Sequence, residues 1–350
     1  MNKFSSPPSL CIGIPTYNRP EALCRRINEI KQYTDTISEI LICDNSEHTH
    51  QSVMDCISDL NIKCTYIKNS ANIGAGANFL RVLENATSDY LWWRGDDDVI
   101  SADQVAAVKG NLTSDPGLLL ISNKAKEIFS SKGIDGFVDN FDKVESMTWA
   151  SQVIVPVTIA KKGLPWGYRA IDWAHIAIII RLFHSCPDLK FTVAPYTLKE
   201  NEFRDVGREG LGWAFFNTTI KNFPDTASIL PNPSLRKRYL TNWRKTKNFL
   251  PLIRTMVGMK LGISTQENIS PSTFFPLLSF GNPRCVLLTI VLYLMSIIPK
   301  FAYQIVFSLA WTRMSIEKKT SFRLDFLMPH TTFYAAYRAI RNNHSAGQAE

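Results

Sequence analysis

The sequence predicts an α/β domain built on a mostly parallel sheet with helices packed on its faces. The first third of the chain alternates short apolar runs with segments whose apolar residues recur at helical spacing. That order implies parallel strands joined by right-handed helical crossovers. Polar motifs follow the apolar runs, and ligands on such sheets bind outside the carboxyl ends of the strands. The order of the expected strands and the position of the polar motifs therefore both predict a ligand site at one edge of the expected sheet.

Each element of this first third has its own signal. The apolar run at residues 10–14 is ended by Pro15 and predicts a buried strand. Residues 21–33 predict a helix because Leu23, Ile27 and Ile30 share one face. In chain order we then expect a strand at 37–43, a helix at 52–60, a strand at 62–67, a helix at 76–86 and a strand at 90–93.

The rest of the chain is less regular. A strand is expected at residues 118–122 and a helix across residues 172–183. Beyond residue 232, basic clusters alternate with apolar stretches that are typical of helices. We therefore predict two parts: an α/β catalytic domain over residues 8–230 and a basic helical, membrane-associating region over residues 231–350.

Charge distinguishes the two parts. Residues 231–350 carry 16 Lys and Arg against 4 Asp and Glu, a net charge of +12, whereas residues 1–230 have a net charge of −4. A basic tail favours an anionic partner, which leaves open a nucleic acid, a phospholipid surface or a phosphorylated substrate. The apolar run at residues 285–298 is shorter than the roughly 20 residues that span a bilayer. Helices lying in the membrane interface fit better, with two buried core helices as the alternative.

The N-terminus and the cysteines indicate the compartment. The first ten residues lack the basic start and apolar stretch of a signal peptide, so we expect the catalytic part to stay in the cytoplasm. The seven cysteines form no CxxC pair. They favour a reducing compartment, with neither a disulfide framework nor a zinc site.

The strongest chemical signal is an acidic motif, Asp96-Asp97-Asp98, which closely follows the apolar run at residues 90–93. Three consecutive carboxylates repel one another unless a cation neutralises them. Oxygen ligands of this kind suit Mg²⁺ or Mn²⁺, which in turn bridge phosphate oxygens. The alternative is a solvated acidic turn, which its position at a strand end disfavours.

Three further polar segments leave expected strands. Residues 14–19 lead from the first strand into a helix, where free backbone N–H groups and Arg19 suit a nucleotide or its phosphates. Asp44, after the second strand, is a candidate acceptor of hydrogen bonds from a base or ribose. Residues 69–78 contain Asn-Ile-Gly-Ala-Gly, which lets backbone approach a ligand closely. This is not GxGxxG and follows the third strand, so a dinucleotide-binding dehydrogenase is disfavoured.

The ordered set of motifs resembles family 2 glycosyltransferases of the GT-A fold. The motifs are Ile-Pro-Thr-Tyr-Asn-Arg at 14–19, Cys-Asp-Asn-Ser at 43–46, Asn-Ile-Gly-Ala-Gly-Ala-Asn at 72–78 and Gly-Asp-Asp-Asp at 95–98. The resemblance covers residues 10–111. In layout and length the chain looks like the bacterial O-antigen branch, including abequosyltransferase-like enzymes that transfer dideoxyhexoses.

The resemblance implies roles for individual residues. It implies that Asp96 and Asp98 form a DxD pair, with Asp98 the direct metal ligand, and that Asp97 contacts the sugar or ribose. Together with the strand-end segments, the donor-binding candidates are Pro15, Thr16, Tyr17, Arg19, Asp44, Asn72, Gly74, Asn78, Asp96, Asp97 and Arg204. The metal candidates are Asp98, Asp96 and His175, with Mn²⁺ or Mg²⁺ as the cofactor.

Family 2 enzymes are generally inverting, which implies that a carboxylate base takes the proton from the acceptor hydroxyl group. Many relatives carry an acidic pair ahead of a helix, whereas this sequence has Asp172 in Ile-Asp-Trp-Ala-His. Asp172 is the candidate base, and a helix N-cap is its alternative role. His175 lies near the same helix face and is either a metal ligand or a core histidine. Glu202 and Asp205 are lower-ranked candidate bases, and Arg204 is a candidate ligand of the diphosphate.

The sequence thus predicts a metal-dependent, inverting glycosyltransferase that uses a nucleotide-diphosphate sugar. Its expected acceptor is a glycan linked to undecaprenyl diphosphate, and its expected place is the cytoplasmic face of the inner membrane, as a peripheral protein without a nucleic-acid partner. One rival is nucleotidyl transfer to a sugar phosphate, disfavoured because no glycine-rich, Lys/Arg-containing loop follows the first strand. The other rival is a non-enzymatic protein that binds membranes or nucleic acid, although the basic tail shows no recognisable nucleic-acid module.

Overall fold

The computed structural model describes residues 7–197, 222–246, 256, 283–299 and 302–303 of the chain. The chain falls into two compact units. The first comprises residues 1–205 and 225–246, and the second comprises residues 206–224 and 247–350. The expected sheet lies in the first unit, which also carries the motifs that the structure describes.

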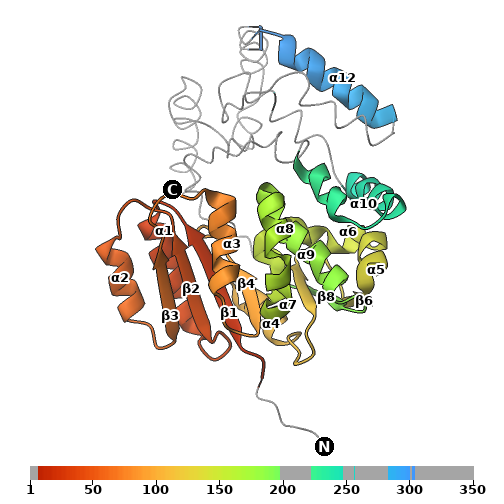
Figure 1. The fold of residues 1–350 in the computed structure, drawn as a ribbon. Helices are drawn as coiled ribbons and strands as arrows, with labels where there is room; N and C mark the ends of the chain where they lie inside the picture. Colours follow the sequence, from red (N-terminus) through yellow and green to blue (C-terminus); the bar gives the residue numbers. More distant parts are fainter. Residues whose placement is uncertain (1–6, 198–221, 247–255, 257–282, 300–301, 304–350) are drawn as a thin grey trace, which may run out of the picture. The chain divides into compact units, whose positions relative to one another are not determined.

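The first unit is built on an eight-stranded sheet with the order β3-β2-β1-β4-β7-β5-β8-β6 (Figure 1). Six strands run parallel to one another, and β7 and β6 run against their neighbours. The strands are β1 (Leu10–Thr16), β2 (Glu39–Asp44), β3 (Lys63–Lys68), β4 (Tyr90–Trp93), β5 (Leu118–Ser122), β6 (Phe129–Lys132), β7 (Val153–Pro156) and β8 (Lys190–Pro195). The predicted mostly parallel sheet is confirmed.

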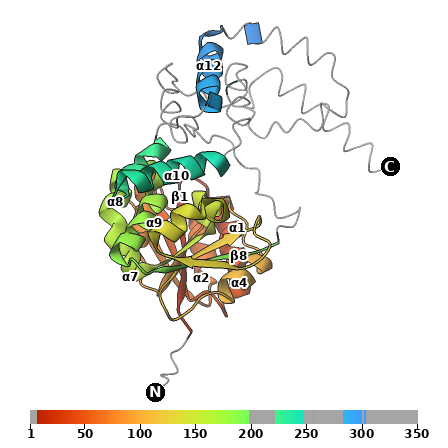
Figure 2. The same cartoon turned by 90° about the vertical axis from the view of Figure 1, so that its right-hand side faces the viewer.

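Helices cover both faces of this sheet (Figures 1 and 2). The α-helices of the first unit are α1 (Pro20–Ile30), α2 (Gln51–Ser58), α3 (Ala75–Asn85), α4 (Ala102–Lys109), α5 (Gly133–Asp139), α6 (Phe141–Val144), α7 (Val157–Ala160), α8 (Leu164–Arg169), α9 (Ala174–Ser185) and α10 (Pro233–Thr246). Short 3₁₀ turns join several of them, including η1 (Lys31–Tyr33), η2 (Glu145–Thr148), η3 (Ala150–Gln152) and η5 (Ile171–Trp173). Local signals fix some ends: Pro20 opens α1, and Ser101 and Gln104 form a capping box on α4.

The alternation of side chains along the strands assigns the helices to faces. Ile12, Ile40 and Trp92 point to one face and pack in a buried cluster with residues of α1, α2 and α4. The opposite face of β1 is so close to α3 that a Cβ atom on Gly13 would lie 2.1 Å from Cγ1 of Val82. Only a glycine fits this crossing, and α3 is thereby held flat on the sheet.

The strand ends line up at one edge. Thr16 lies beside Asp44, and Asp44 lies beside Lys68, in the parallel register of β1, β2 and β3. The ladder continues past the strands, since Asn45 N donates to Thr16 O and Asn69 N donates to Asp44 O. The predicted motifs therefore meet at the carboxyl edge of the sheet, as parallel strands require.

Two features of the second half of the sheet differ from the expectations. The helix expected from residue 172 begins at Ala174, because Ile171–Trp173 forms a 3₁₀ turn and Trp173 occupies the N-cap position. The N-cap role considered for Asp172 is therefore wrong. Strand β7 was not expected, and its reversed direction brings the residues that precede it, rather than those that follow it, to the carboxyl edge.

Helix α10 belongs to the first unit, which extends beyond the boundary predicted at residue 230. Tyr239 meets Phe141 edge-on at a ring-centroid distance of 5.4 Å, and Asn242 Nδ2 donates to Val138 O. Arg238 pairs with Asp135 and with Asp139. The basic residues of this helix thus partly serve contacts within the domain.

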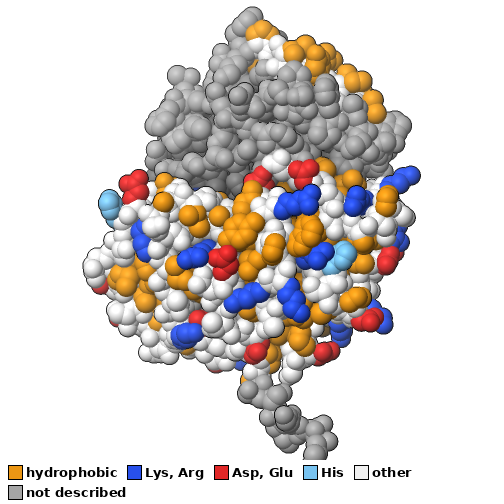
Figure 3. Space-filling view, viewed as in Figure 1, with side chains coloured by type: hydrophobic (Ala, Val, Ile, Leu, Met, Phe, Trp, Pro, Cys, Tyr) orange, Lys and Arg blue, Asp and Glu red, His pale blue; other side chains and the backbone are white. Residues whose placement is uncertain are grey.

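The described part of the second unit includes helix α12 (Pro283–Ile297). Leu288 and Leu292 are buried, whereas an apolar face of the helix is exposed (Figure 3). The exposed residues on and next to this helix are Val286, Leu287, Ile290, Tyr293, Leu294, Ile297 and Ile298. Within the described residues, the structure contains no helix with both the length and the apolar character that a membrane crossing requires.

Candidate functional site

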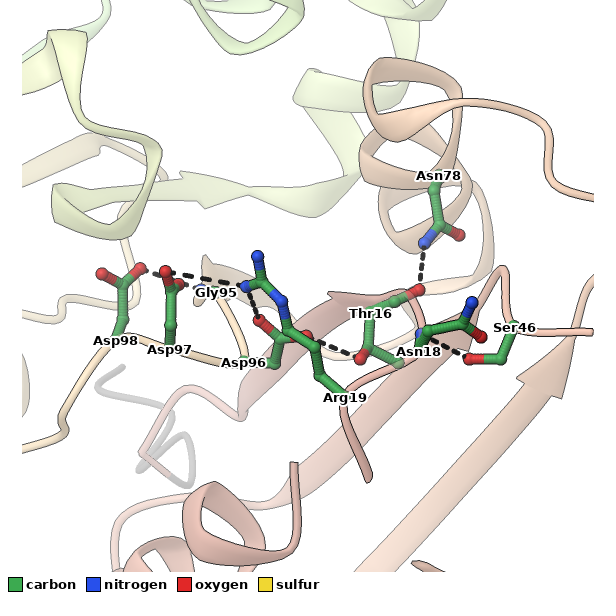
Figure 4. A network of polar contacts seen from close by, with 9 residues as sticks. All are labelled: Thr16, Asn18, Arg19, Ser46, Asn78, Gly95, Asp96, Asp97 and Asp98. Carbon is green, nitrogen blue, oxygen red and sulfur yellow. Dashed lines mark hydrogen bonds and ion pairs between the residues drawn. The ribbon is translucent and has the colours of Figure 1, made fainter. Parts of the chain in front are cut away.

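Asp96 connects the ends of two neighbouring strands. Thr16 Oγ1, at the end of β1, donates to Asp96 Oδ2 over 2.7 Å, and Arg19 NH1 donates to Asp96 Oδ1 over 3.0 Å (Figure 4). Burial raises the pKa of Asp96, and the hydrogen bond from Thr16 and the charge of Arg19 oppose that shift. Both carboxylate oxygens therefore have partners inside the protein.

Asp97 and Asp98 lie together beside Asp96 (Figure 4). The backbone N–H of Gly95 donates to Asp98 Oδ2 over 2.9 Å. A Cβ atom on Gly95 would lie 2.7 Å from Asp97 Oδ1 and 3.0 Å from Asp98 Oδ2, so the two carboxylates converge over a glycine that leaves room for them.

This arrangement suits a hard divalent ion. Mg²⁺ is commonly held by one or two carboxylates, with phosphate oxygens and water supplying the other ligands. Asp97 and Asp98 meet that requirement. Among the described residues, no group of three or more His, Cys, Asp and Glu side chains forms a metal cage. Asp96 remains a predicted ligand, and each of its oxygens is already hydrogen-bonded, to Thr16 or to Arg19.

Arg94 lies behind the acidic motif and is almost fully buried. Its guanidinium donates to Ser151 O over 3.0 Å and to Val99 O, and it stacks 5.0 Å from the ring centroid of Trp92. Burial lowers the pKa of Arg94, while the charge of Asp98 raises it. Arg94 thus links Val99, the residue after the acidic motif, to Ser151 in the segment before β7. It also places a positive charge near Asp98.

Asp44 lies buried at the end of β2 and accepts three hydrogen bonds. The N–H and Oγ of Ser46 donate to Oδ1 over 2.7 and 2.5 Å, and Tyr66 OH donates to Oδ2 over 2.5 Å. Burial and the neighbouring carboxylate raise the pKa of Tyr66. Among the described residues these bonds use three of the roughly four acceptor positions of the carboxylate.

A network of asparagine amides joins the loops after β1, β2 and β3. Asn69 Nδ2 donates to the side-chain oxygens of Asn45 and Asn78. Asn78 Nδ2 donates to Thr16 O and Cys43 O, and Asn45 Nδ2 donates to Asn72 Oδ1. Gly74, at φ 86°, turns the chain into α3, a backbone geometry that favours glycine. The predicted donor-binding segment 72–78 therefore shapes the site, and Asn78 holds strand ends rather than pointing freely into the site.

The candidate base Asp172 is exposed in the 3₁₀ turn before α9. This turn lies against the first turn of α3, since a Cβ atom on Gly76 would be 2.4 Å from Ile171 O. Asp172 therefore comes from an element that packs at the same edge as the predicted donor loops. Its role as base stays a prediction.

His175 lies in an aromatic cluster beneath this turn. Its ring is 5.7 Å from Phe79 and 5.9 Å from Trp173, and Phe79 stacks on Trp93 at 4.7 Å. Burial lowers the pKa of His175 to about 4, although hydrogen bonds with the backbone of Met147 and Thr148 act in the other direction. Its Nε2 has no hydrogen-bond partner among the residues that the structure describes. The imidazole is neutral, and its role as a metal ligand stays a prediction.

The segment from Met147 to Gln152 was missed by the sequence analysis. It is held by His175, by Arg94 through Ser151 O, and by Trp92, whose Nε1 also donates to Ser151 O. Trp149 in this segment is 48% exposed. The reversed strand β7 places this segment at the site, and hydrophobic periodicity gives no signal for such a placement. The tryptophan at position 149 was the available sequence signal.

The remaining predicted residues divide into two groups. Tyr17 is exposed next to Arg19, and Pro15 is in β1, so both lie at the carboxyl edge as expected. Arg204, Glu202 and Asp205 lie outside the described residues.

Comparisons with known proteins agree with the motifs. Residues 11–123 match the family model described as Glycosyl transferase family 2. Over 120 residues the chain is 33% identical to the abequosyltransferase RfbV of Salmonella typhimurium strain LT2, a match that spans 33% of this chain and 35% of the relative. The matched part of the chain, which carries the acidic motif, is therefore similar to family 2 glycosyltransferase domains.

Solved structures with similarity to the chain include the crystal structure of S. aureus TarS 1–349, with 14% identity and a TM-score of 0.49, covering 78% of this chain and 80% of that one. The same TarS fragment in complex with UDP has 13% identity and a TM-score of 0.46, and in complex with UDP-GlcNAc it has 13% identity and a TM-score of 0.47. Both complexes also cover 78% of this chain and 80% of the TarS chain.

Proposed function

We propose that the protein is a metal-dependent, inverting glycosyltransferase that moves one sugar from a nucleotide-diphosphate donor to a hydroxyl group of a glycan. The observation that carries this proposal is the convergence of Asp97 and Asp98 over Gly95, at a strand end inside the family 2 segment. The similarity to an abequosyltransferase supports a role in O-antigen or surface polysaccharide synthesis.

The donor nucleotide occupies the carboxyl edge of β1, β2 and β4. Asp44, held in place by Ser46 and Tyr66, accepts a hydrogen bond from the base or ribose. Arg19 and the free N–H groups at the start of α1 attract the diphosphate. Asp97 and Asp98 would hold the divalent ion, Mn²⁺ or Mg²⁺, so in this proposal Asp97 is a metal ligand rather than the sugar or ribose contact that the resemblance implies. When bound, the ion would neutralise charge on the departing diphosphate.

The transfer is a single displacement at the anomeric carbon. Asp172 takes the proton from the acceptor hydroxyl group as its oxygen bonds to the anomeric carbon, and the bond between that carbon and the diphosphate breaks. Asp172 suits this role because it is exposed and comes from a turn that packs on α3. Glu202 and Asp205 are the lower-ranked alternatives as base, and Arg204 is an additional candidate contact to the diphosphate.

The acceptor is proposed to be a glycan carried on undecaprenyl diphosphate, which places the protein on the cytoplasmic face of the inner membrane. The apolar face of α12 supports this placement, because a helix with exposed apolar side chains lies stably in a membrane interface. The net charge of +12 over residues 231–350 adds attraction to anionic lipids.

The deciding experiment is calorimetric titration with UDP, CDP, GDP and dTDP, each with and without Mn²⁺. We expect one nucleotide to bind in a metal-dependent manner and Asp98→Ala to lose that binding. Asp115→Ala, which removes an exposed carboxylate away from the motif, is the matched control and should bind normally. If all four nucleotides failed to bind under either condition, the proposed function would be wrong.

A further inference from the structure

Arg19 is held against the carboxylates that the metal needs. Its NH1 lies 3.0 Å from Asp96 Oδ1 and 3.7 Å from Asp97 Oδ2 (Figure 4). The side chain of Asp96 is 7% exposed and that of Asp97 is 23% exposed, so water screens these contacts only in part. One guanidinium therefore neutralises part of the acidic motif in the ligand-free protein.

We propose that Arg19 is an internal counter-cation that competes with the divalent ion for the acidic motif, so that the metal binds at full strength only when a donor diphosphate draws Arg19 away. This inference concerns the regulation of the proposed donor site. Its nucleotide part rests on the proposed function, whereas its metal part does not.

The competition follows from the positions of the oxygens. Asp97 contributes Oδ1 to the space over Gly95 and Oδ2 to Arg19, so the metal and the guanidinium share one carboxylate. Both oxygens of Asp96 are already hydrogen-bonded, one to Thr16 and one to Arg19. Two cations at adjacent oxygens repel each other, and the charge of Arg19 therefore weakens metal binding.

The release of Arg19 follows from its surroundings. Arg19 occupies the N-cap position of α1, where free N–H groups and the helix dipole favour an anion. Its side chain is 27% exposed, which leaves room for it to turn toward a bound diphosphate. Guanidinium pairs well with phosphate oxygens, so a diphosphate offers Arg19 a replacement for the carboxylates.

Binding of the metal and binding of the nucleotide are thermodynamically coupled if Arg19 competes with the metal. If the nucleotide removes a competitor of the metal, it strengthens metal binding, and the metal strengthens nucleotide binding by the same factor. Replacing Arg19 by a neutral residue should raise the affinity for the metal alone and reduce this coupling factor. A residue that merely contacts the phosphates would weaken nucleotide binding without strengthening binding of the metal alone.

The test uses the full chain and Mn²⁺, whose free concentration is read directly by electron paramagnetic resonance. Without nucleotide, Arg19→Gln should bind Mn²⁺ about tenfold more tightly than the wild type, as expected for removal of one adjacent positive charge. Arg19→Met should behave in the same way, and Arg19→Lys should stay close to the wild type. Arg81→Gln is the control, because it removes an equal charge from a residue that pairs with Glu84 instead.

The second arm repeats the Mn²⁺ titration with the nucleoside diphosphate that binds best among UDP, CDP, GDP and dTDP. We expect the coupling factor between this nucleotide and Mn²⁺ to be smaller in Arg19→Gln than in the wild type. Unchanged or weaker binding of Mn²⁺ alone to both neutral variants, with thermal unfolding like that of the wild type, would overturn the inference. If instead no nucleotide bound to the wild type while the metal arm behaved as expected, the proposed function alone would be wrong.

Discussion

The hydroxyl group of Tyr66 orients Asp44, the proposed contact to the nucleotide. Its OH donates to Asp44 Oδ2, the oxygen that Ser46 does not contact. Tyr66→Phe removes this bond and lets the carboxylate rotate. We expect about three- to tenfold weaker nucleotide binding by calorimetry, the loss typical of one hydrogen bond to a charged group.

The control for Tyr66 is Tyr168→Phe. Tyr168 OH donates to Glu84 Oε1 over 2.7 Å on the surface of α3, away from Asp44, so its loss should leave nucleotide binding unchanged. Equal nucleotide affinity in Tyr66→Phe and the wild type would show that Asp44 does not depend on Tyr66 for its orientation.

His175 makes stability depend on pH. Its pKa in the folded protein is about 4, below the ordinary value of 6.5, because burial disfavours the charged ring. Between these two values the unfolded chain takes up a proton that the folded chain does not, so the free energy of unfolding falls as pH falls through this window. From pH 7 to pH 5 we expect this residue to account for a loss on the order of 1–2 kcal/mol.

Denaturant unfolding at the two pH values tests this expectation. His175→Gln should lose less stability than the wild type between pH 7 and pH 5, although it is less stable at pH 7. His48→Gln, at an exposed position, should lose as much as the wild type. An identical pH response in His175→Gln and the wild type would show that the ring titrates normally in the folded state.

At the scale of elements, the crossing of β1 and α3 depends on one glycine. A Cβ atom on Gly13 would lie 2.1 Å from Val82 Cγ1 and 2.8 Å from Leu91 Cδ1. Gly13→Ala should reduce the free energy of unfolding by about 1–3 kcal/mol, the usual cost of overpacking. The measurement is denaturant unfolding of the full chain.

A double variant identifies the cause of that loss. In Gly13→Ala with Val82→Ala, the clashing methyl group is absent, so the loss should be smaller than the sum of the two single losses. Gly110→Ala, whose new Cβ atom would meet only Ala106 O at 3.2 Å, serves as the control. Strict additivity of Gly13→Ala and Val82→Ala would contradict the contact described here.

Elements with a strong local pattern were predictable and the others were not. The strands at residues 90–93 and 118–122 match β4 and β5, because each is a short apolar run with clear limits. β6 (Phe129–Lys132) was missed because Phe-Ser-Ser-Lys has little apolar character, and its place depends on pairing with β8. Long-range pairing of this kind leaves no periodic signal within the strand itself.

Parts of the site that follow strands with a strong local pattern were predictable as well. Asp44 and Asp96 follow strands of the regular part, so their neighbourhood could be expected from parallel register alone. Arg94 and Trp149 could not be placed, since their surroundings depend on the reversed strand β7. The bonds of Asp96 to Thr16 and Arg19 are set by side-chain geometry, about which residue spacing carries no information.

At the scale of the whole molecule, the membrane proposal rests on the exposed face of α12. Leu287 is 62% exposed and Leu294 is 49% exposed. Burying a leucine side chain contributes about 1.5–3 kcal/mol, so Leu287→Glu with Leu294→Glu should lower binding to phosphatidylglycerol-containing vesicles by at least about tenfold. Vesicle flotation measures this binding, and calorimetry should find nucleotide affinity unchanged.

The matched control is Ile128→Glu, which places the same charge at an apolar side chain that is 59% exposed in the first unit. It should leave vesicle binding unchanged. Equal flotation of the α12 variant and the wild type would rule out this helix as the membrane contact. Deletion of residues 281–350 offers a second check, since a folded protein with undiminished membrane binding would move the contact to another part of the chain.

The reversed strand β7 has a consequence for how such proteins diversify. The proposed donor side is built from consecutive segments of the chain, up to the acidic motif, whereas the segment bearing Trp149 enters the site from the opposite direction and from a later stretch. Insertions or exchanges after β5 can therefore reshape the Trp149 side of the site while the proposed donor side stays intact. We therefore expect relatives to share the proposed donor side and to differ on the Trp149 side.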